Sequence, residues 1–101
     1  MEEVLKILAI EQELPGKTSA DFAPHLQDEA RQVWMLYQQG VIREFYFHRD
    51  DHVAVLMLEC EDVEEAGRIL DALPLVRAGV IRFQVIPLVP YDGFSRLFAG
   101  E

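Results

Sequence analysis

Glu44, Tyr46 and His48 place a carboxylate, a phenol and an imidazole at every second position of one short segment. Residues two apart in a β-strand point to the same face, so this segment would present all three groups to one side of a sheet. An imidazole titrates near neutral pH and a carboxylate can orient it, so His48 and Glu44 could move a proton. Tyr46 could stabilise charge that builds on a carbonyl oxygen. The alternative is a histidine at the sheet rim beside a solvated glutamate.

Four further residues could bind a ligand. Arg43 could hold a ligand carboxylate through its bidentate guanidinium, although a charge at the surface or at a sheet edge is its commoner role. Trp34 and Tyr37 recur at helical spacing on an apolar face, where they either pack in the core or line a pocket between helix and sheet. His25, early in the same predicted helix, either reaches the mouth of the sheet or lies on the surface.

Metal and cofactor motifs are absent from the sequence. The three histidines, His25, His48 and His52, lack H-x-x-x-H or comparable spacing, and Asp50-Asp51 beside His52 is typical of a solvated turn. A P-loop, G-x-G-x-x-G, G-x-S-x-G and C-x-x-C do not occur. The single cysteine, Cys60, excludes a disulfide framework within the chain. We therefore expect no metal and no cofactor.

Length and charge restrict the partners. The chain has 101 residues, enough for one domain and too few for two, and a formal net charge of −9. This charge disfavours nucleic acid and anionic membranes. The apolar runs are far shorter than the ~20 residues of a membrane span, and the start Met1-Glu2-Glu3 lacks the basic flank of a secretory leader. We expect a cytoplasmic protein.

The hydrophobic pattern predicts the order strand, helix, hairpin, helix, strand and tail. Strands are expected over Val4–Ile10, Val41–Arg49, His52–Cys60 and Val80–Ile86, and helices from near Ala23 to Gly40 and from Asp62 to Leu73-Pro74. This βαββαβ order is that of the ferredoxin-like fold. We therefore predict an α+β domain over residues 1–101, with a four-stranded antiparallel sheet and two helices on one face.

In the segment His52–Cys60, the side chains expected on each of the two sheet faces are apolar, so its sheet would be buried on both faces. One small domain cannot supply the second layer, which predicts two copies packed face to face as a dimeric α/β barrel. Glu44, Tyr46 and His48 would then face the space between the subunits, where a small ligand would bind. The tail, residues 91–101, is more apolar than one small core needs and is expected to pack on the partner subunit.

Three stretches carry a resemblance to a known family. They are Val33–Gly40, the hairpin Ile42–Glu59, and Leu73–Gly79 with the following strand to Tyr91. In these stretches the chain resembles the muconolactone isomerase-like group of dimeric α/β-barrel proteins; related families on this fold include cofactor-free monooxygenases and YciI-like proteins. The resemblance implies isomerisation of an unsaturated lactone by proton transfer, without cofactor or metal. No local motif maps the group's catalytic acid or base onto this chain.

Three functions follow as alternatives. The first is a cofactor-independent isomerase of small unsaturated lactones or organic acids, with His48 or Glu44 moving the proton. The second is a non-catalytic ligand-binding or accessory dimer, because the same pocket lacks a recognisable catalytic set. The third is a cofactor-free monooxygenase of aromatic substrates.

Overall fold

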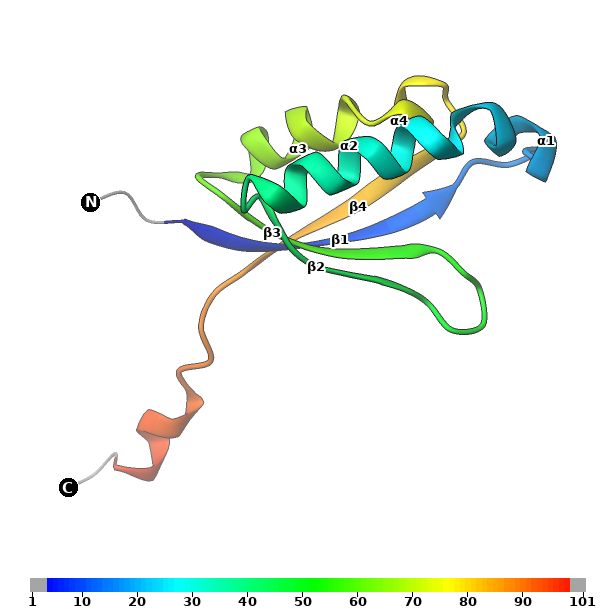
Figure 1. Cartoon of the computed structure of the whole chain (residues 1–101). Helices are drawn as coiled ribbons and strands as arrows, with labels where there is room; N and C mark the ends of the chain where they lie inside the picture. The colour runs from blue at the N-terminus through cyan, green and yellow to red at the C-terminus, as the bar shows by residue number, and fades with distance from the viewer. Residues whose placement is uncertain (1–3, 99–101) are drawn as a thin grey trace.

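The fold is a four-stranded antiparallel sheet covered on one face by helices (Figure 1). The computed structural model describes residues 4–98, so Met1-Glu2-Glu3 and the last three residues of the predicted tail lie outside the described part. The strands are β1 (Leu5–Glu13), β2 (Ile42–Phe47), β3 (Ala54–Cys60) and β4 (Ile81–Leu88), in the order β2-β3-β1-β4. The predicted α+β, ferredoxin-like architecture is confirmed.

Two strands are longer than predicted. β1 continues beyond Ile10 because Glu11, Gln12 and Glu13 pair with residues of β4, in the register Glu11 to Phe83 and Glu13 to Ile81. β4 runs through Pro87 to Leu88, which an edge strand tolerates because the missing N–H is not needed by an outer neighbour. The extra length of β1 brings a carboxylate onto the helix-covered face of the sheet.

The helix layer contains more elements than predicted. Before the long helix α2 (Leu26–Gln38) come a short helix α1 (Ser19–Phe22) and the 3₁₀ turn η1 (Ala23–His25), which accommodates Pro24 in a first turn. α3 (Val63–Asp71) starts after Asp62, whose Oδ1 accepts a hydrogen bond from the Glu65 N–H at 2.8 Å. A further helix, α4 (Pro74–Arg77), was not predicted; Pro74 opens it, because its fixed φ suits a first helical position.

A β-bulge in β2 places Ile42 on the sheet face opposite to the one that regular alternation predicts. Ile42 pairs with Leu58 but Glu44 pairs with Met57, so Arg43 is an extra residue between them. By strict alternation Ile42 would share the face of Glu44. Instead Ile42 is fully buried in the core with Leu58 and Ile7, while Glu44 lies on the opposite face.

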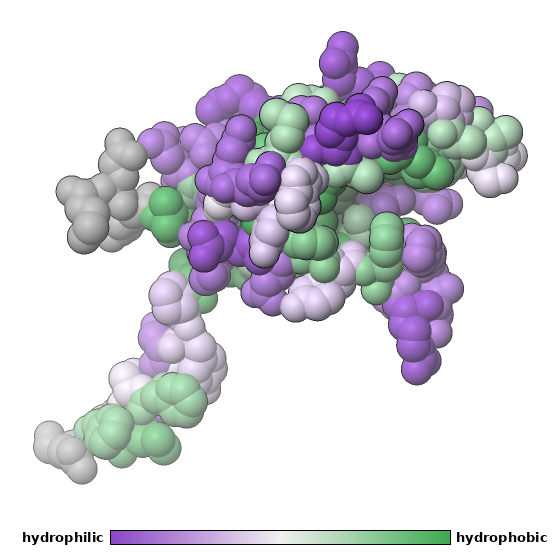
Figure 2. All heavy atoms as spheres, in the orientation of Figure 1, coloured by the Kyte–Doolittle hydropathy of each residue, from purple (hydrophilic) through white to green (hydrophobic). Residues whose placement is uncertain are grey.

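The sheet face opposite the helices carries apolar side chains that are only half-buried. They are Leu8, Ile10, Val55, Met57, Ile86 and Leu88. Beyond β4, the tail extends away from the domain and ends in the 3₁₀ helix η2 (Gly93–Leu97), where hydrophobic residues gather (Figures 1 and 2). Leu97 is 73% exposed. Within residues 4–98 no helix combines the length and apolar character needed to cross a membrane.

The bulge predicts unequal consequences for two neighbouring substitutions. Ile42→Ala removes a fully buried side chain and is expected to lower the free energy of unfolding by about 2–5 kcal/mol. Arg43→Ala, at the exposed extra position, is expected to change it by less than about 0.5 kcal/mol. Urea denaturation of both variants measures the difference, and equal effects would contradict the bulged register.

Candidate functional site

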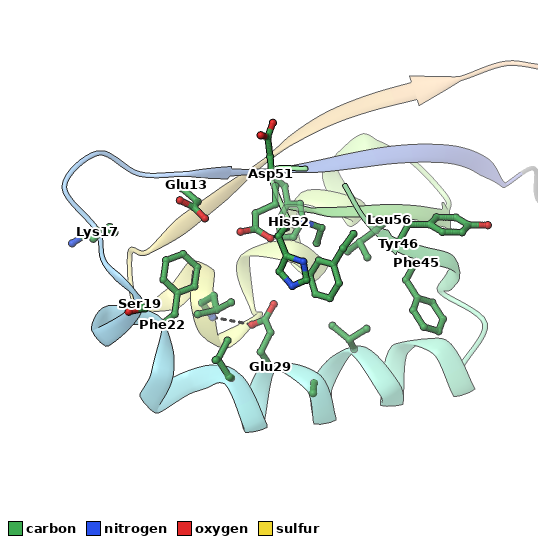
Figure 3. A pocket seen from close by; sticks show the side chains of 18 of the residues that line it. Glu13, Lys17, Ser19, Phe22, Glu29, Phe45, Tyr46, Asp51, His52 and Leu56 are labelled. Atoms are coloured by element: carbon green, nitrogen blue, oxygen red, sulfur yellow. Dashed lines mark hydrogen bonds between the residues drawn. The ribbon is translucent and has the colours of Figure 1, made fainter. Parts of the chain in front are cut away.

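A cavity of about 690 Å³ lies between the helix layer and the sheet (Figure 3). This volume is in the range of about 300–1,000 Å³ typical of small-molecule sites. Residues of α1, α2, all four strands and the hairpin turn line it. The cavity is therefore on the side of the sheet opposite to the one expected from the sequence.

Seven phenylalanine, tyrosine and tryptophan residues line the cavity: Phe22, Trp34, Tyr37, Phe45, Tyr46, Phe47 and Phe83. Trp34 and Tyr37 on α2 have ring centroids 5.7 Å apart, and Tyr37 meets Phe45 of β2 edge-on at 5.1 Å. Trp34 is 55% exposed and Phe45 is 46% exposed, so these rings border an open space instead of filling the core. Such a wall suits a flat apolar ligand.

Glu11 is the one charged residue of the described chain that is buried, at 8% exposure. It lies on the cavity side of β1, beyond Ile7 and Ala9, which share its parity. Its Oε1 accepts a hydrogen bond from the Ala54 N–H at 2.8 Å, at the start of β3. Burial raises the pKa of Glu11, and the nearby charge of Glu13 raises it further, against the lowering effect of the Ala54 hydrogen bond.

Glu29 faces Glu11 from the helix layer. It lies on the stripe of α2 that lines the cavity, between Leu26 and Val33. Its Oε1 accepts a hydrogen bond from the Leu75 N–H at 2.9 Å, in the first turn of α4 (Figure 3). Burial raises the pKa of Glu29, and the charge of Glu11 adds to that rise, while the Leu75 hydrogen bond opposes it. Each carboxyl group thus has one oxygen engaged by the backbone.

His52 is a further titratable group of the cavity. Its ring stacks on Phe47, with centroids 4.1 Å apart and planes 17° from parallel, and points into the space that Glu29 also faces (Figure 3). His52 has φ of +55°, in the left-handed region that residues other than glycine adopt uncommonly. Backbone of this kind is concentrated at functional sites. The sequence favoured a solvated turn for His52, but the residue lines the cavity.

The structure separates the residues predicted for the site. Trp34 and Tyr37 line the cavity, which is one of the two placements predicted for them. Tyr46 borders it, but its phenol points away (Figure 3) and donates a hydrogen bond to Glu44 Oε1 at 2.8 Å, which raises the pKa of Tyr46. Glu44 does not line the cavity.

The other three predicted residues also lie outside the cavity. His48 Nδ1 accepts hydrogen bonds from the backbone N–H groups of Asp50 and Asp51 and so holds the hairpin turn. Arg43 borders a separate shallow pocket at the end of α2. His25, at the start of α2, acts on the site only through its charge, which lowers the pKa of Glu29.

The sequence contains signals that Glu11 and Glu29 could face the interior of the domain. Glu29 is the one charged residue within the helical stripe of Leu26, Ala30 and Val33. Glu11 continues the alternation of Ile7 and Ala9, but a polar Glu-Gln-Glu segment before Pro15 favours a loop, and strand pairing overrides that tendency.

Other chemistry has less support. Among residues 4–98, no three histidine, cysteine, aspartate or glutamate side chains come close enough together to hold a metal ion. Cys60 is buried in the core, and burial raises the pKa of its thiol to about 11, which leaves it unreactive as a nucleophile near neutral pH. Glu11, Glu29 and His52 are therefore the groups that could act on a ligand, by transferring protons.

The raised pKa of Glu29 predicts a pH-dependent stability difference. The folded state holds the Glu29 proton more tightly than the unfolded chain, so stability falls as pH rises from the ordinary value of 4.5 through the folded pKa. Glu29→Gln keeps an oxygen for the Leu75 N–H but carries no charge. Its stability relative to the wild type should therefore improve between pH 4.5 and about pH 7, as measured by urea denaturation at both values.

Glu29→Ala serves as the control, because it also removes the hydrogen-bond acceptor of Leu75. This variant is expected to be less stable than Glu29→Gln at both pH values. A wild-type difference from Glu29→Gln that stays constant with pH would contradict the raised pKa.

Solved structures share this fold. No protein-family model matches the chain, and no curated protein sequence matches it. Muconolactone isomerase superposes with a TM-score of 0.71 at 18% identity, over 86% of this chain and 91% of the isomerase. The 5-chloro-2-hydroxyhydroquinone dehydrochlorinase of Burkholderia phenoliruptrix, in complex with 2,5-dihydroxybenzoquinone, superposes with a TM-score of 0.63 at 15% identity, over 87% and 97% of the two chains. The predicted resemblance is thus confirmed in the fold: this chain has the ferredoxin-like fold of muconolactone isomerase.

Proposed function

We propose that this protein binds small unsaturated ring compounds in the cavity between helices and sheet, and isomerises them by moving a proton without a cofactor. The observation that carries the proposal is the pair Glu11 and Glu29, which enter an aromatic cavity from its sheet wall and its helix wall. Burial raises the pKa of both carboxyl groups, which makes each a stronger base when ionised and a usable acid when protonated.

The proposed reaction on an unsaturated lactone is a proton shift in two steps. One carboxylate removes a proton from the carbon next to the carbonyl, and the electron pair moves onto the carbonyl oxygen to form a dienolate. The other carboxyl group, protonated, then delivers its proton to the far carbon of the dienolate, so the double bond moves and the carbonyl is restored. His52 would donate a hydrogen bond to the oxygen while it carries charge. General acid–base catalysis of this kind contributes roughly 10²–10⁴-fold in rate.

A purely structural role for both glutamates is the competing explanation. Glu11 supplies an acceptor to the first N–H of β3, and Glu29 supplies one to an N–H in the first turn of α4. These hydrogen bonds need an oxygen but not a charge, and each occupies one oxygen of its carboxyl group. Replacement by glutamine therefore separates the structural role from the chemical one.

The named activities of the structural neighbours agree with this proposal. One neighbour is named as an isomerase of a lactone, and the other is named as a dehydrochlorinase and was solved with a hydroxylated quinone. Both names describe chemistry on small compounds. At 15% and 18% identity these names support a class of ligand for this chain and no individual substrate.

The test uses α-angelica lactone, an uncharged lactone whose double bond moves by this proton shift. In deuterium oxide, wild-type protein is expected to accelerate both isomerisation and deuterium uptake, followed by NMR. Glu11→Gln and Glu29→Gln are each expected to lose about 100-fold or more of the rate while remaining folded.

Glu44→Gln and His48→Asn are the comparison, because they remove a carboxylate and an imidazole from residues outside the cavity. These variants are expected to keep the rate. If Glu44→Gln and His48→Asn lose the isomerisation rate while Glu11→Gln and Glu29→Gln retain it, the Glu44–His48 pair predicted from the sequence moves the proton. Saturable binding without any exchange in the wild type would instead identify a ligand-binding dimer without catalysis.

We also propose that two copies pair through their open sheet faces and that each tail packs on the partner. This face carries six half-buried apolar side chains, and the tail presents exposed Phe94, Leu97 and Phe98 away from its own domain. A monomer would leave both surfaces in water. The cytoplasmic location predicted above stays a prediction.

Removing the tail tests this assembly. A chain ending at Pro90 is expected to shift from dimer toward monomer in sedimentation, because the apolar tail contacts would be lost. Leu97→Ser combined with Phe98→Ser, which keeps the chain length, should shift it in the same direction. A dimer mass unchanged in both variants would show that the tail packs elsewhere.

A further inference from the structure

The charges around the cavity are unevenly distributed. Five ionic side chains line it: Glu11, Glu13, Glu29, Asp51 and Lys17, with His52 as a sixth titratable group. Lys17 is the one lysine among them, and its side chain points away from the cavity (Figure 3). No arginine of residues 4–98 lines this space; Arg43, the residue suited to a ligand carboxylate, borders the other pocket.

The carboxylates of the cavity act on one another. The charge of Glu13 raises the pKa of Glu11, and the charge of Glu11 raises the pKa of Glu29. The three groups therefore lie within effective electrostatic range of one another. A net charge of −9 on the whole chain adds to the same negative potential.

We infer that the cavity excludes anions, and that its substrate is a ring compound without a carboxylate. An anionic ligand would bring a further negative charge into a space that four acidic residues already line, and the one lysine that lines it points away. This inference rests on the proposed function, because it concerns the ligand of the same cavity. Of the lactones and organic acids considered as ligands, only uncharged compounds would then bind in the cavity.

Glu13 is the residue whose charge can be changed without touching the proposed acid–base pair. It is exposed, it ends β1, its carboxylate points toward the cavity (Figure 3), and its charge acts on Glu11. We assign Glu13 to specificity: its charge repels anionic ligands, and its carboxylate neither removes nor delivers the transferred proton.

The experiment compares three probes of nearly identical shape: benzamide, benzoate and benzamidine, which are neutral, anionic and cationic near neutral pH. Trp34 is the only tryptophan of the chain and lines the cavity, so its fluorescence reports binding. Wild-type protein is expected to bind benzamide at least about tenfold more tightly than benzoate, with benzamidine no weaker than benzamide.

Glu13→Lys should raise the affinity for benzoate at least about fivefold and leave that for benzamide within about twofold. Glu64→Lys, on the exposed side of α3, makes the same change in net charge far from the cavity and is the matched control. Its affinities should stay close to those of the wild type.

Two results would overturn the inference while the proposed function stands. Benzoate binding as tightly as benzamide would show that the cavity accepts anions. Benzamidine binding as weakly as benzoate would show that hydrogen bonding, and not charge, ranks the probes. If none of the three probes changes Trp34 fluorescence saturably, the cavity does not bind rings, and the proposed function falls together with the inference.

Discussion

The site depends on the pairing of β1 between β3 and β4. β1 is a central strand, and its inward side chains Ile7 and Ala9 are fully buried in the core. Pairing with β4 continues to Glu13, three residues beyond the apolar segment, because backbone hydrogen bonding along a neighbouring strand does not require apolar side chains. The alternation that buries Ile7 and Ala9 then directs Glu11 into the same layer. A carboxylate thus enters the interior as a consequence of strand register.

Burial of that carboxylate is unfavourable, and the fold limits the cost. Glu11 and Glu29 each receive one backbone hydrogen bond, from Ala54 and from Leu75, but neither has a cationic partner among the ion pairs of residues 4–98. A hydrogen bond to one oxygen offsets part of the desolvation, and the pKa of both groups remains raised. An arginine at this place would favour the ionised carboxylates. The arrangement is typical of sites in which a proton must move.

The two faces of the sheet have different roles. The helix layer packs on one face of the sheet over the hydrophobic core. It separates from that face near the β2–β3 hairpin, where the aromatic cavity lies. The other face has no cover within the domain and carries half-buried apolar side chains. Binding chemistry and subunit association can therefore use opposite faces of one thin sheet, and the bulge in β2 keeps the two sets of side chains apart by turning Ile42 inward and Glu44 outward.

The sequence alone determined the element order, the antiparallel sheet, the helix-covered face and the aromatic character of α2, because these follow from local hydrophobic periodicity and turn residues. It also identified Trp34 and Tyr37 as residues able to line a pocket. Local patterns did not predict which face would hold the cavity. That depended on where the helix layer diverges from the sheet and on a one-residue bulge at Arg43, which changes the parity of β2. Tertiary structure likewise decided that Glu11 and Glu29 lie across the cavity from each other, because the two residues come from different layers. Within its own segment, each glutamate has the sequence pattern of a solvated charge. Only the packing of α2 over β1 buries Glu11, partly buries Glu29 and brings both to one cavity.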